Sequence, residues 1–226
     1  PSRPENLQDL KEVVREKGLE IGLAFDGDAD RLGVISKKGD IIFPDMQMII
    51  FSRSILEEKK GAKIIFDVKC SKLLAEAITE REGIPIMSKT GHSHIKDRIL
   101  KEKALLGGEM SGHIFFNDKW PGFDDAIYAG ARMLEILSNF SPGENIFSNL
   151  PELVSTPEIN IETADEEKFK IVEEFISTFN FKNSKAITID GVRVEFEKGW
   201  GLLRASNTSP NLVLRFEANS KEDLES

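Results

Sequence analysis

The chain has 226 residues, 40% of them apolar, and a formal net charge of −9, a composition that excludes a wholly disordered chain and a single-core miniprotein. The surplus of carboxylates repels polyanions and no basic patch offsets it, so nucleic acid and acidic membrane surfaces are not expected partners. The single cysteine, Cys70, excludes an intramolecular disulfide, and no apolar stretch approaches the length of a membrane span, so we expect a cytoplasmic protein.

The first 44 residues predict a helix, a strand and a hairpin. Apolar residues recur at helical spacing between residues 5 and 17, and Gly18 is placed to end that helix. Alternation over 19–25 and the apolar run 32–35 predict two strands around an acidic loop, and a turn then leads into a third strand at 41–43. These elements are too few to bury a core of their own, so we expect the sequence to begin inside a domain.

From residue 45 onward, helical and strand patterns alternate. Helices are predicted at 45–56, 71–82, 92–102 and 124–139, and strands at 63–68, 84–88, 104–107 and 114–116. Strands that alternate with helices indicate a mostly parallel sheet covered on both faces. We therefore expect a Rossmann-like mixed sheet domain of the α/β class over residues 45–150.

Beyond Pro151 the pattern changes to a small α+β domain. Strands are predicted at 158–161, 187–189, 192–196, 201–204 and 212–216, with one helix at 165–179. Asp190-Gly191 lies between two alternating runs, which is a strong hairpin signal. An antiparallel sheet with a helix is therefore expected over residues 151–226.

The acidic loop Asp26-Gly27-Asp28-Ala29-Asp30-Arg31 follows the predicted strand at 19–25. Its three carboxylates stand at alternate positions, separated by small residues, and can surround one hard divalent cation such as Mg²⁺. Without a cation the three charges would repel one another. The alternative interpretation is a solvated acidic turn.

A second alternative for this loop is an aspartyl-phosphate phosphatase. Asp26 would then be the nucleophile, Asp28 the acid, and Asp124 and Asp125 metal ligands. The last two residues open a predicted helix, where carboxylates are favoured by the exposed backbone amides whatever the function. We therefore predict helix capping for both of them.

The segment Gly107-Gly108-Glu109-Met110-Ser111-Gly112-His113 ends a predicted strand. Its glycines would let the backbone approach a ligand, and its Glu, Ser and His side chains offer acceptors and donors that suit a polyhydroxylated molecule. A sugar is the expected ligand class. A tight turn with incidental polar residues is the alternative.

Two further loops predict contacts with an anion. Arg204-Ala205-Ser206-Asn207-Thr208-Ser209-Pro210 combines a guanidinium with hydroxyl, amide and backbone donors, which together can hold a phosphate, although a polar hairpin loop has the same composition. Lys69 and Gly91-His92-Ser93 each follow a predicted parallel strand, at the edge where open α/β sheets bind ligands.

Four stretches in this order carry a family resemblance: AFDGDADR (24–31), DVKC (67–70) with KTGHS (89–93), GGEMSGH (107–113), and RASNTSP (204–210). The set resembles the α-D-phosphohexomutase family, and GEMSGH is most similar to its bacterial phosphomannomutase/phosphoglucomutase members. The resemblance covers nearly the whole chain. It implies an isomerase that moves a phosphoryl group between the 1- and 6-positions of mannose or glucose through a bisphosphorylated intermediate and an enzyme phosphoserine.

The resemblance also implies a role for residues in each of the four loops. Asp26, Asp28 and Asp30 match the Mg²⁺ ligands, and Arg31, Lys69, His92 and His113 match basic groups of the active cleft. Glu109 and Ser111 match the loop that binds sugar hydroxyls, and Arg204, Ser206, Asn207 and Thr208 match the loop that holds the non-reacting phosphate.

The chain departs from the family pattern in two ways. Ala29 stands where the family commonly has Gly, and we expect it to be tolerated if its φ is negative. No segment matches the Thr-Ala-Ser-His-Asn-Pro-like stretch that carries the phosphoserine. The resemblance therefore implies the C-terminal portion of the enzyme: the tail of domain 2 (1–44), domain 3 (45–150) and domain 4 (151–226).

Such a portion is expected to be inactive alone and to partner the N-terminal domains of the same enzyme and a hexose phosphate. A non-catalytic module that binds sugar phosphates is an alternative function. The sequence does not rank mannose against glucose, because the two sugars differ only in the orientation of one hydroxyl group.

Overall fold

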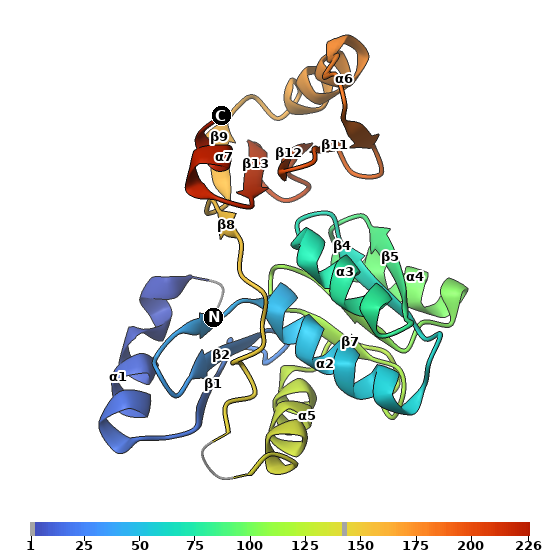
Figure 1. Ribbon diagram of the computed structural model, residues 1–226. Helices are drawn as coiled ribbons and strands as arrows, with labels where there is room; N and C mark the ends of the chain where they lie inside the picture. The colour runs from blue at the N-terminus through green and yellow to red at the C-terminus, as the bar shows by residue number, and fades with distance from the viewer. Residues whose placement is uncertain (1–2, 142–143) are drawn as a thin grey trace. The chain divides into compact units, whose positions relative to one another are not determined.

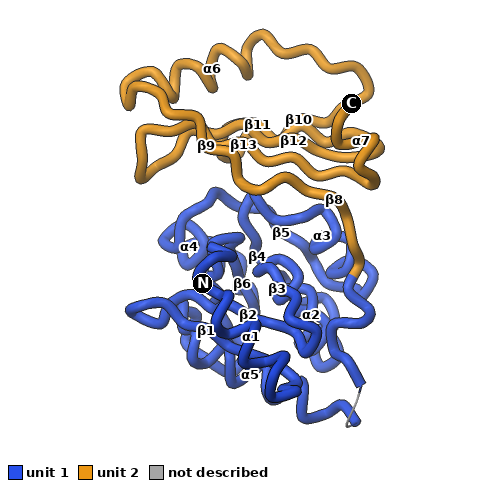
Figure 2. The backbone as a smooth tube through the Cα atoms, turned by 90° about the vertical axis from the view of Figure 1, so that its left-hand side faces the viewer, with its two compact units in different colours: residues 1–150 blue, residues 151–226 orange. Residues whose placement is uncertain are grey.

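The computed structural model describes residues 3–141 and 144–226. Between Leu150 and Pro151 the chain divides into two compact units, which Figure 2 colours separately. Unit 1 contains both the predicted domain tail, 1–44, and the predicted α/β domain, 45–150. Unit 2 consists of residues 151–226.

Unit 1 begins with two helical segments and a three-stranded antiparallel sheet in the order β1-β2-β3. The elements are η1 (Pro4–Leu7), α1 (Gln8–Lys17), β1 (Ile21–Phe25), β2 (Leu32–Ser36) and β3 (Ile41–Ile42). Gly18 ends α1 as predicted, because its φ of 60° is a left-handed conformation that glycine adopts without strain.

The central strand β2 is buried along its whole length, since both of its faces are covered. Ile35 packs beneath α1 with Leu7 and Val14. Leu32 and Val34 belong instead to the large core that the following α/β elements build. The first 44 residues therefore share a core with the segment that follows them, which is why both lie in one compact unit.

The rest of unit 1 is a four-stranded mixed sheet with helices on both faces (Figure 1). Its elements are α2 (Pro44–Glu58), β4 (Lys63–Asp67), α3 (Lys72–Glu80), β5 (Ile84–Ser88), α4 (His92–Glu102), β6 (Leu106–Gly108), β7 (Ile114–Phe116) and α5 (Ala126–Ser138). The strand order is β5-β4-β6-β7: β4 pairs in parallel with β5 and β6, and β7 pairs antiparallel to β6.

Successive residues of β4 face the two helical layers. Ile64 and Phe66 pack into the core that contains residues of α2 and α3. Ile65 points to the opposite face, where it packs with Ile95 and Ile99 of α4. A strand buried on both faces reads as a continuous apolar run, which is how β4 appears in the sequence.

Unit 2 is an antiparallel sheet with one long helix. Its elements are β8 (Val154–Ser155), β9 (Ile159–Glu162), α6 (Lys168–Thr178), β10 (Lys185–Ile187), β11 (Val192–Glu195), β12 (Gly199–Ala205), β13 (Asn211–Ala218) and α7 (Lys221–Glu225). The strands run in the order β10-β11-β12-β13-β8, with β9 also pairing with β13. Val172 of α6 packs on Ala205 and Leu212 of the sheet.

The predicted Asp190-Gly191 hairpin joins β10 to β11, and the close packing of strand β12 makes Gly191 irreplaceable there. The φ of Gly191 is 71°, and a Cβ atom at this position would lie 2.3 Å from the carbonyl oxygen of Leu203. Any side chain would therefore meet both backbone strain and a steric clash.

The predicted fold class is confirmed: an α/β unit with a mixed sheet is followed by a small α+β unit with an antiparallel sheet. The strand β8 and the helix α7 were not predicted, because two and five residues are too short for a periodic pattern. Within residues 3–141 and 144–226, no helix has the length and apolar character needed to cross a membrane.

Candidate functional site

The three aspartates of the acidic loop converge in the turn that joins β1 to β2. Asp26, Asp28 and Asp30 each offer one carboxylate oxygen, and these oxygens all lie within 4.8 Å of one another. Asp28 is exposed, whereas the other two are half-buried. Three hard oxygen donors at this spacing fit the preference of Mg²⁺ for carboxylates supplemented by water.

Asp26 is the anchored member of the three. Its Oδ1 accepts hydrogen bonds from the backbone N–H groups of Asp30 at 3.2 Å and Arg31 at 3.1 Å, and its Oδ2 lies 2.7 Å from Arg31 Nε. Burial raises the pKa of Asp26, but the backbone N–H and the charge of Arg31 outweigh burial and hold the pKa below its ordinary value. The loop is thus folded around an ionised Asp26.

We expected Ala29 to be tolerated if its φ were negative, but its φ is positive. Its φ is +58°, in the left-handed region, where a Cβ atom is strained. The turn holds it there because its N–H donates to Asp26 O at 3.2 Å and its carbonyl accepts from Ala126 N at 3.0 Å. The loop therefore carries strain that a glycine would not.

We expect Ala29→Gly to stabilise unit 1 by about 1 kcal/mol, because glycine removes the strain of a left-handed Cβ at that position. Thermal and chemical unfolding would measure the change. Ala24→Gly is the matched control: Ala24 lies in β1 without a positive φ, so that substitution should destabilise by about 0.5 to 1 kcal/mol. Equal effects of both substitutions would contradict the prediction.

Backbone pairing joins the acidic loop to the predicted sugar loop. Arg31 and His113 form an isolated antiparallel bridge, and Leu32 N donates to Gly112 O at 3.1 Å. Gly112 has a φ of 103°, and a Cβ atom there would lie 3.3 Å from the Leu32 carbonyl oxygen. Two loops more than 70 positions apart along the chain are thus fixed side by side within unit 1.

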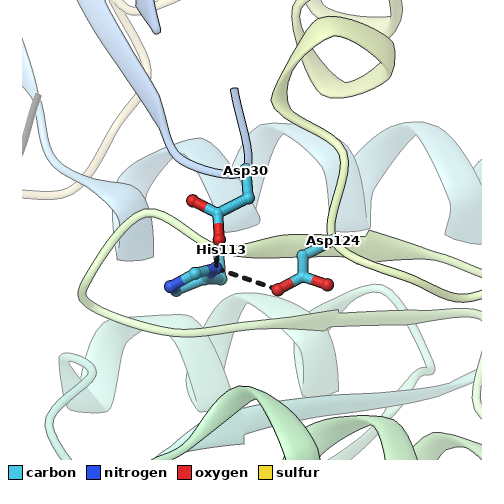
Figure 3. Close-up of side chains that lie close together, drawn as sticks. All are labelled: Asp30, His113 and Asp124. Carbon is cyan, nitrogen blue, oxygen red and sulfur yellow. Dashed lines mark ion pairs between the residues drawn. The ribbon is translucent and has the colours of Figure 1, made fainter. Parts of the chain in front are cut away.

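A second cluster forms around Asp124, which the sequence did not identify as a site residue. Its Oδ2 lies 3.0 Å from Nδ1 of His113 and 3.6 Å from Nδ1 of His92, and its Oδ1 accepts from Lys96 Nζ at 3.2 Å. Figure 3 shows Asp30 and Asp124 on either side of the same ring nitrogen of His113. The distance from that nitrogen to Asp30 Oδ2 is 3.5 Å.

Opposing effects act on the pKa of Asp124. Burial raises it, but the backbone amide, Lys96 and His113 together lower it below its ordinary value. A half-buried carboxylate therefore remains ionised and balances several basic groups.

The capping prediction is confirmed for Asp125 and wrong for Asp124. Asp125 is the N-cap of α5, and its side chain accepts from Tyr128 N at 2.9 Å. Asp124 lies one residue outside the helix and directs its carboxylate to the basic groups instead. The sequence could not separate the two, because either residue of an Asp-Asp pair can occupy the cap.

In the predicted sugar loop, Glu109 is almost fully buried and is held by two donors. Gly91 N–H donates to its Oε1, and Ser111 Oγ donates to its Oε2 at 3.1 Å. Burial raises the pKa of Glu109, and the nearby charge of Asp67 raises it further, against the opposing effects of Gly91, His113 and Ser111. Glu109 thereby links the turn before α4 to the loop between β6 and β7.

Asp67, at the end of β4, ties three loops together at the carboxyl edge of the parallel strands. Its Oδ1 accepts from Cys70 Sγ at 3.1 Å and from Met110 N at 3.3 Å, and its Oδ2 accepts from Thr90 Oγ1 at 3.0 Å. Lys69 lies in the same buried turn. Cys70 is thus a donor inside this network.

Two glycines of the sugar loop are required by packing, a reason that the sequence did not indicate. A Cβ atom on Gly107 would lie 2.6 Å from Ile99 Cδ1, and one on Gly108 would lie 2.5 Å from Met48 Sδ. Both residues belong to β6, with α4 on one face and α2 on the other. They are small because helices on both faces approach the strand closely.

In unit 2, the loop between β12 and β13 is organised around Ser206. Its buried Oγ accepts from Thr208 N at 3.3 Å, Ser209 N at 3.2 Å and Ser209 Oγ at 2.8 Å. Asn207 and Thr208 are exposed at the tip of the loop. The turn therefore presents two polar side chains to solvent on a backbone that Ser206 fixes.

Arg204 is buried and paired with a residue that sequence reasoning did not assign to the site. Its Nε donates to Asp190 Oδ2 at 3.0 Å and its Nη2 donates to Oδ1 at 3.4 Å. The two side chains are only 5% and 12% exposed. Asp190 was read only as a turn residue, because the pairing of β11 with β12 that brings it to Arg204 is not local in sequence.

Unit 1 brings together the predicted residues of three loops. Arg31 and the three aspartates lie beside His113 and His92, and Glu109 with Ser111 connects this group to the turns after β4 and β5. The predicted phosphate-loop residues Arg204, Ser206, Asn207 and Thr208 are gathered within unit 2.

Three family descriptions match consecutive parts of this chain. The phosphoglucomutase/phosphomannomutase alpha/beta/alpha domain II matches residues 1–39, alpha/beta/alpha domain III matches 43–154, and the C-terminal domain matches 158–226. These matches leave only 40–42 and 155–157 between them.

Individual proteins agree with these matches. The chain is 52% identical over 226 residues to a phosphomannomutase/phosphoglucomutase from Pseudomonas syringae pv. tomato, covering 100% of this chain and 49% of that protein. The crystal structure of a phosphoglucomutase/phosphomannomutase family protein from Burkholderia thailandensis aligns with a TM-score of 0.94 at 46% identity, covering 100% of this chain and 48% of that one.

A more distant structure shares the fold. N-acetylphosphoglucosamine mutase from Aspergillus fumigatus, in complex with GlcNAc-6P and magnesium, aligns with a TM-score of 0.65 at 16% identity over 95% of this chain and 50% of that one. The chain spans about half the length of the curated relatives that it matches.

Proposed function

The chain belongs to the phosphoglucomutase/phosphomannomutase family, and we propose that it carries the magnesium, sugar and phosphate loops of a hexose phosphate mutase. The proposed reaction interconverts the 1-phosphate and the 6-phosphate of mannose or glucose. A phosphoserine that this sequence does not contain would give its phosphoryl group to a sugar hydroxyl, and the other phosphate of the bisphosphate would return to the serine.

One observation carries this proposal: three carboxylates that fit one cation lie next to a group of basic side chains. Asp26, Asp28 and Asp30 offer oxygens within 4.8 Å of one another, and the Arg31–His113 backbone bridge places His113 beside them. Phosphoryl transfer requires positive charge around the transferring group and in-line positioning of the two oxygens. This part of unit 1 supplies both signs of charge that such a reaction uses.

The acidic loop is proposed to hold Mg²⁺, because its donor set is made only of hard oxygens and because the ionised Asp26 is already fixed by Arg31. When bound, a divalent cation neutralises charge that develops on the transferring phosphoryl oxygens. Arg31 would contact the same phosphoryl group with its guanidinium, and Lys69, His92 and His113 would line the site as further basic groups.

Glu109 and Ser111 are proposed to orient the sugar through its hydroxyls, and the loop from Arg204 to Thr208 to hold the phosphate that does not react. The exposed tip at Asn207 and Thr208 leaves donors available to an anion, on a turn that Ser206 keeps rigid. This proposal requires the loop to accept a phosphate on either end of the sugar.

The aspartyl-phosphate phosphatase alternative requires a free oxygen on Asp26. Both oxygens of Asp26 are engaged, one by two backbone N–H groups and the other by Arg31. This arrangement favours a structural ligand over a nucleophile. Treatment with beryllofluoride separates the two functions, because it would modify Asp26 only in the phosphatase.

The proposed function is tested by titrating glucose 1-phosphate and mannose 1-phosphate into the chain by calorimetry, with Mg²⁺ present and with EDTA. We expect saturable binding that inorganic phosphate competes for and that EDTA weakens. A chain that binds neither sugar phosphate at millimolar concentration would contradict the proposal.

Arg204→Lys should weaken the binding of either sugar phosphate by about tenfold, because lysine keeps the charge opposite Asp190 but loses the two-pronged guanidinium geometry. The same calorimetric titration measures the change. Arg98→Lys is the control, since Arg98 forms an exposed ion pair with Glu102 on α4 and should leave the affinity unchanged. Unchanged binding by the Arg204 variant would place the phosphate elsewhere.

A further inference from the structure

Asp124 has no role in the sequence motifs, yet it faces three basic side chains at once. We propose that it is a positioning residue, which orients the imidazole of His113 through Nδ1 and so presents Nε2 to the substrate. The inference rests on the proposed function for the identity of that substrate, a hexose phosphate. The orientation of the ring depends on unit 1 alone.

The backbone around Asp124 is fixed from three sides. Asp124 itself forms an antiparallel bridge with Phe115 of β7, two residues after His113. Asp125 caps α5, and the next residue, Ala126, donates its N–H to Ala29 O in the acidic loop at 3.0 Å. These contacts hold the main chain from which the carboxylate of Asp124 reaches His113.

The geometry at His113 favours Asp124 over the other carboxylate nearby. Its Nδ1 lies 3.0 Å from Asp124 Oδ2 and 3.5 Å from Asp30 Oδ2, and only 13% of the His113 side chain is exposed. Asp30 is also one of the three proposed ligands of the cation. Asp124 is therefore the nearer carboxylate partner of Nδ1, and the one that is not assigned to the cation.

A hydrogen bond from Nδ1 determines what the other ring nitrogen can do. With the proton held on Nδ1, a neutral His113 carries a lone pair on Nε2, which lies on the side of the ring away from Asp124 in Figure 3. If a sugar hydroxyl attacks phosphorus, its proton can pass to this nitrogen as the new oxygen–phosphorus bond forms and the bond from phosphorus to the serine oxygen breaks.

Asp124 also restrains two neighbours of His113. The ring of His92 lies almost parallel to that of His113, with a centroid separation of 5.9 Å and an interplanar angle of 23°, and its Nδ1 is 3.6 Å from Asp124. Lys96 donates to the other oxygen of Asp124 at 3.2 Å. One carboxylate thus contacts all three basic side chains.

The test uses the tautomer of His113, which can be read directly from the ¹⁵N shifts of the ring. The chain has only three histidines, so ¹⁵N-histidine labelling gives spectra that three single His→Gln variants assign. In spectra of the neutral ring, the wild-type protein should show a protonated Nδ1 and an unprotonated Nε2 for His113. In Asp124→Asn this preference should be lost, because Lys96, which can only donate, holds the amide oxygen and leaves the N–H₂ group, which cannot accept the proton, facing His113.

Asp125→Asn is the matched control, because it removes a carboxylate one residue away and asparagine still caps the helix. It should leave the tautomer of His113 unchanged. A wild-type His113 protonated at Nε2 would overturn the proposal without reference to any variant, so the test stands even if a variant fails to fold. A tautomer that survives Asp124→Asn, or that changes equally in both variants, would also overturn it.

A parallel titration with glucose 1-phosphate separates this inference from the proposed function. If Asp124→Asn weakens binding at least fivefold while Asp125→Asn does not, the oriented ring contributes to the substrate site. If the wild-type protein binds no hexose phosphate but His113 shows the expected tautomer, the proposed function fails and the positioning of the ring stands. If hexose phosphate binds but His113 is protonated at Nε2, the proposed function stands and the positioning of the ring fails.

Discussion

Asp28→Ala is expected to lower the affinity of the chain for Mg²⁺ by about 100-fold or more, because affinity at oxygen-ligand sites follows the number of charged ligands. Asp28 is the exposed member of the three aspartates and makes no hydrogen bond to any residue in the part of the chain that the structure describes. Its removal should therefore leave the acidic loop folded. Calorimetric titration with Mg²⁺ measures the affinity directly.

A substitution of another exposed aspartate provides the control for this result. Asp9→Ala removes another exposed carboxylate, on α1, and should leave the Mg²⁺ affinity unchanged. Thermal unfolding of the Asp28 variant without Mg²⁺ should match the wild type within about 0.5 kcal/mol, as for other exposed substitutions. Unchanged Mg²⁺ binding in a folded Asp28 variant would remove the metal site from the acidic loop.

Asp190→Ala is expected to destabilise unit 2 by about 3 to 5 kcal/mol, because it leaves the buried guanidinium of Arg204 without its carboxylate partner. The two side chains are 5% and 12% exposed and share two hydrogen bonds, so water cannot readily replace the lost contact. Chemical denaturation followed by tryptophan fluorescence reports on this unit when Trp120, which lies in unit 1, is replaced by phenylalanine in both proteins, because Trp200 of β12 is then the remaining tryptophan.

Glu225→Ala is the control for the Asp190 variant, since the pair of Glu225 with Lys221 is exposed and 3.8 Å long. Its removal should cost less than about 1 kcal/mol of unfolding free energy.

Inorganic phosphate should stabilise the Asp190 variant more than the wild type if Arg204 binds phosphate, because the anion would replace the missing charge. A loss of stability below 1 kcal/mol would show that Arg204 finds other partners.

The sequence predicted those parts of the site in which the chemistry is local. Asp26, Asp28 and Asp30 are separated by one residue each, so their convergence follows from a single turn. Their placement beside His113 depends on the bridge from Arg31 and was not predictable from spacing. The family resemblance, which the three matched domains confirm, was what assigned these loops to one site.

The residues that sequence reasoning missed act through long-range contacts. Asp124 was read as a helix cap because an Asp-Asp pair before a helix gives no sign of which residue caps. Asp190 was read as a turn residue because its partner, Arg204, reaches it only when β11 pairs with β12. The sign of φ at Ala29 was also not predictable, because a small side chain can be accommodated at either negative or positive φ.

The core shared by the first 44 residues and the α/β layer has a consequence for recombining members of this family. Leu32, Val34 and Ile42 pack into the same interior as Met48 and Phe66, so a crossover placed near residue 45 would cut through interlocking side chains from two parents. A crossover between Leu150 and Pro151 would fall at the boundary between the two compact units. Chimeras that exchange unit 2 whole should retain solubility far more often than those that graft the acidic loop alone.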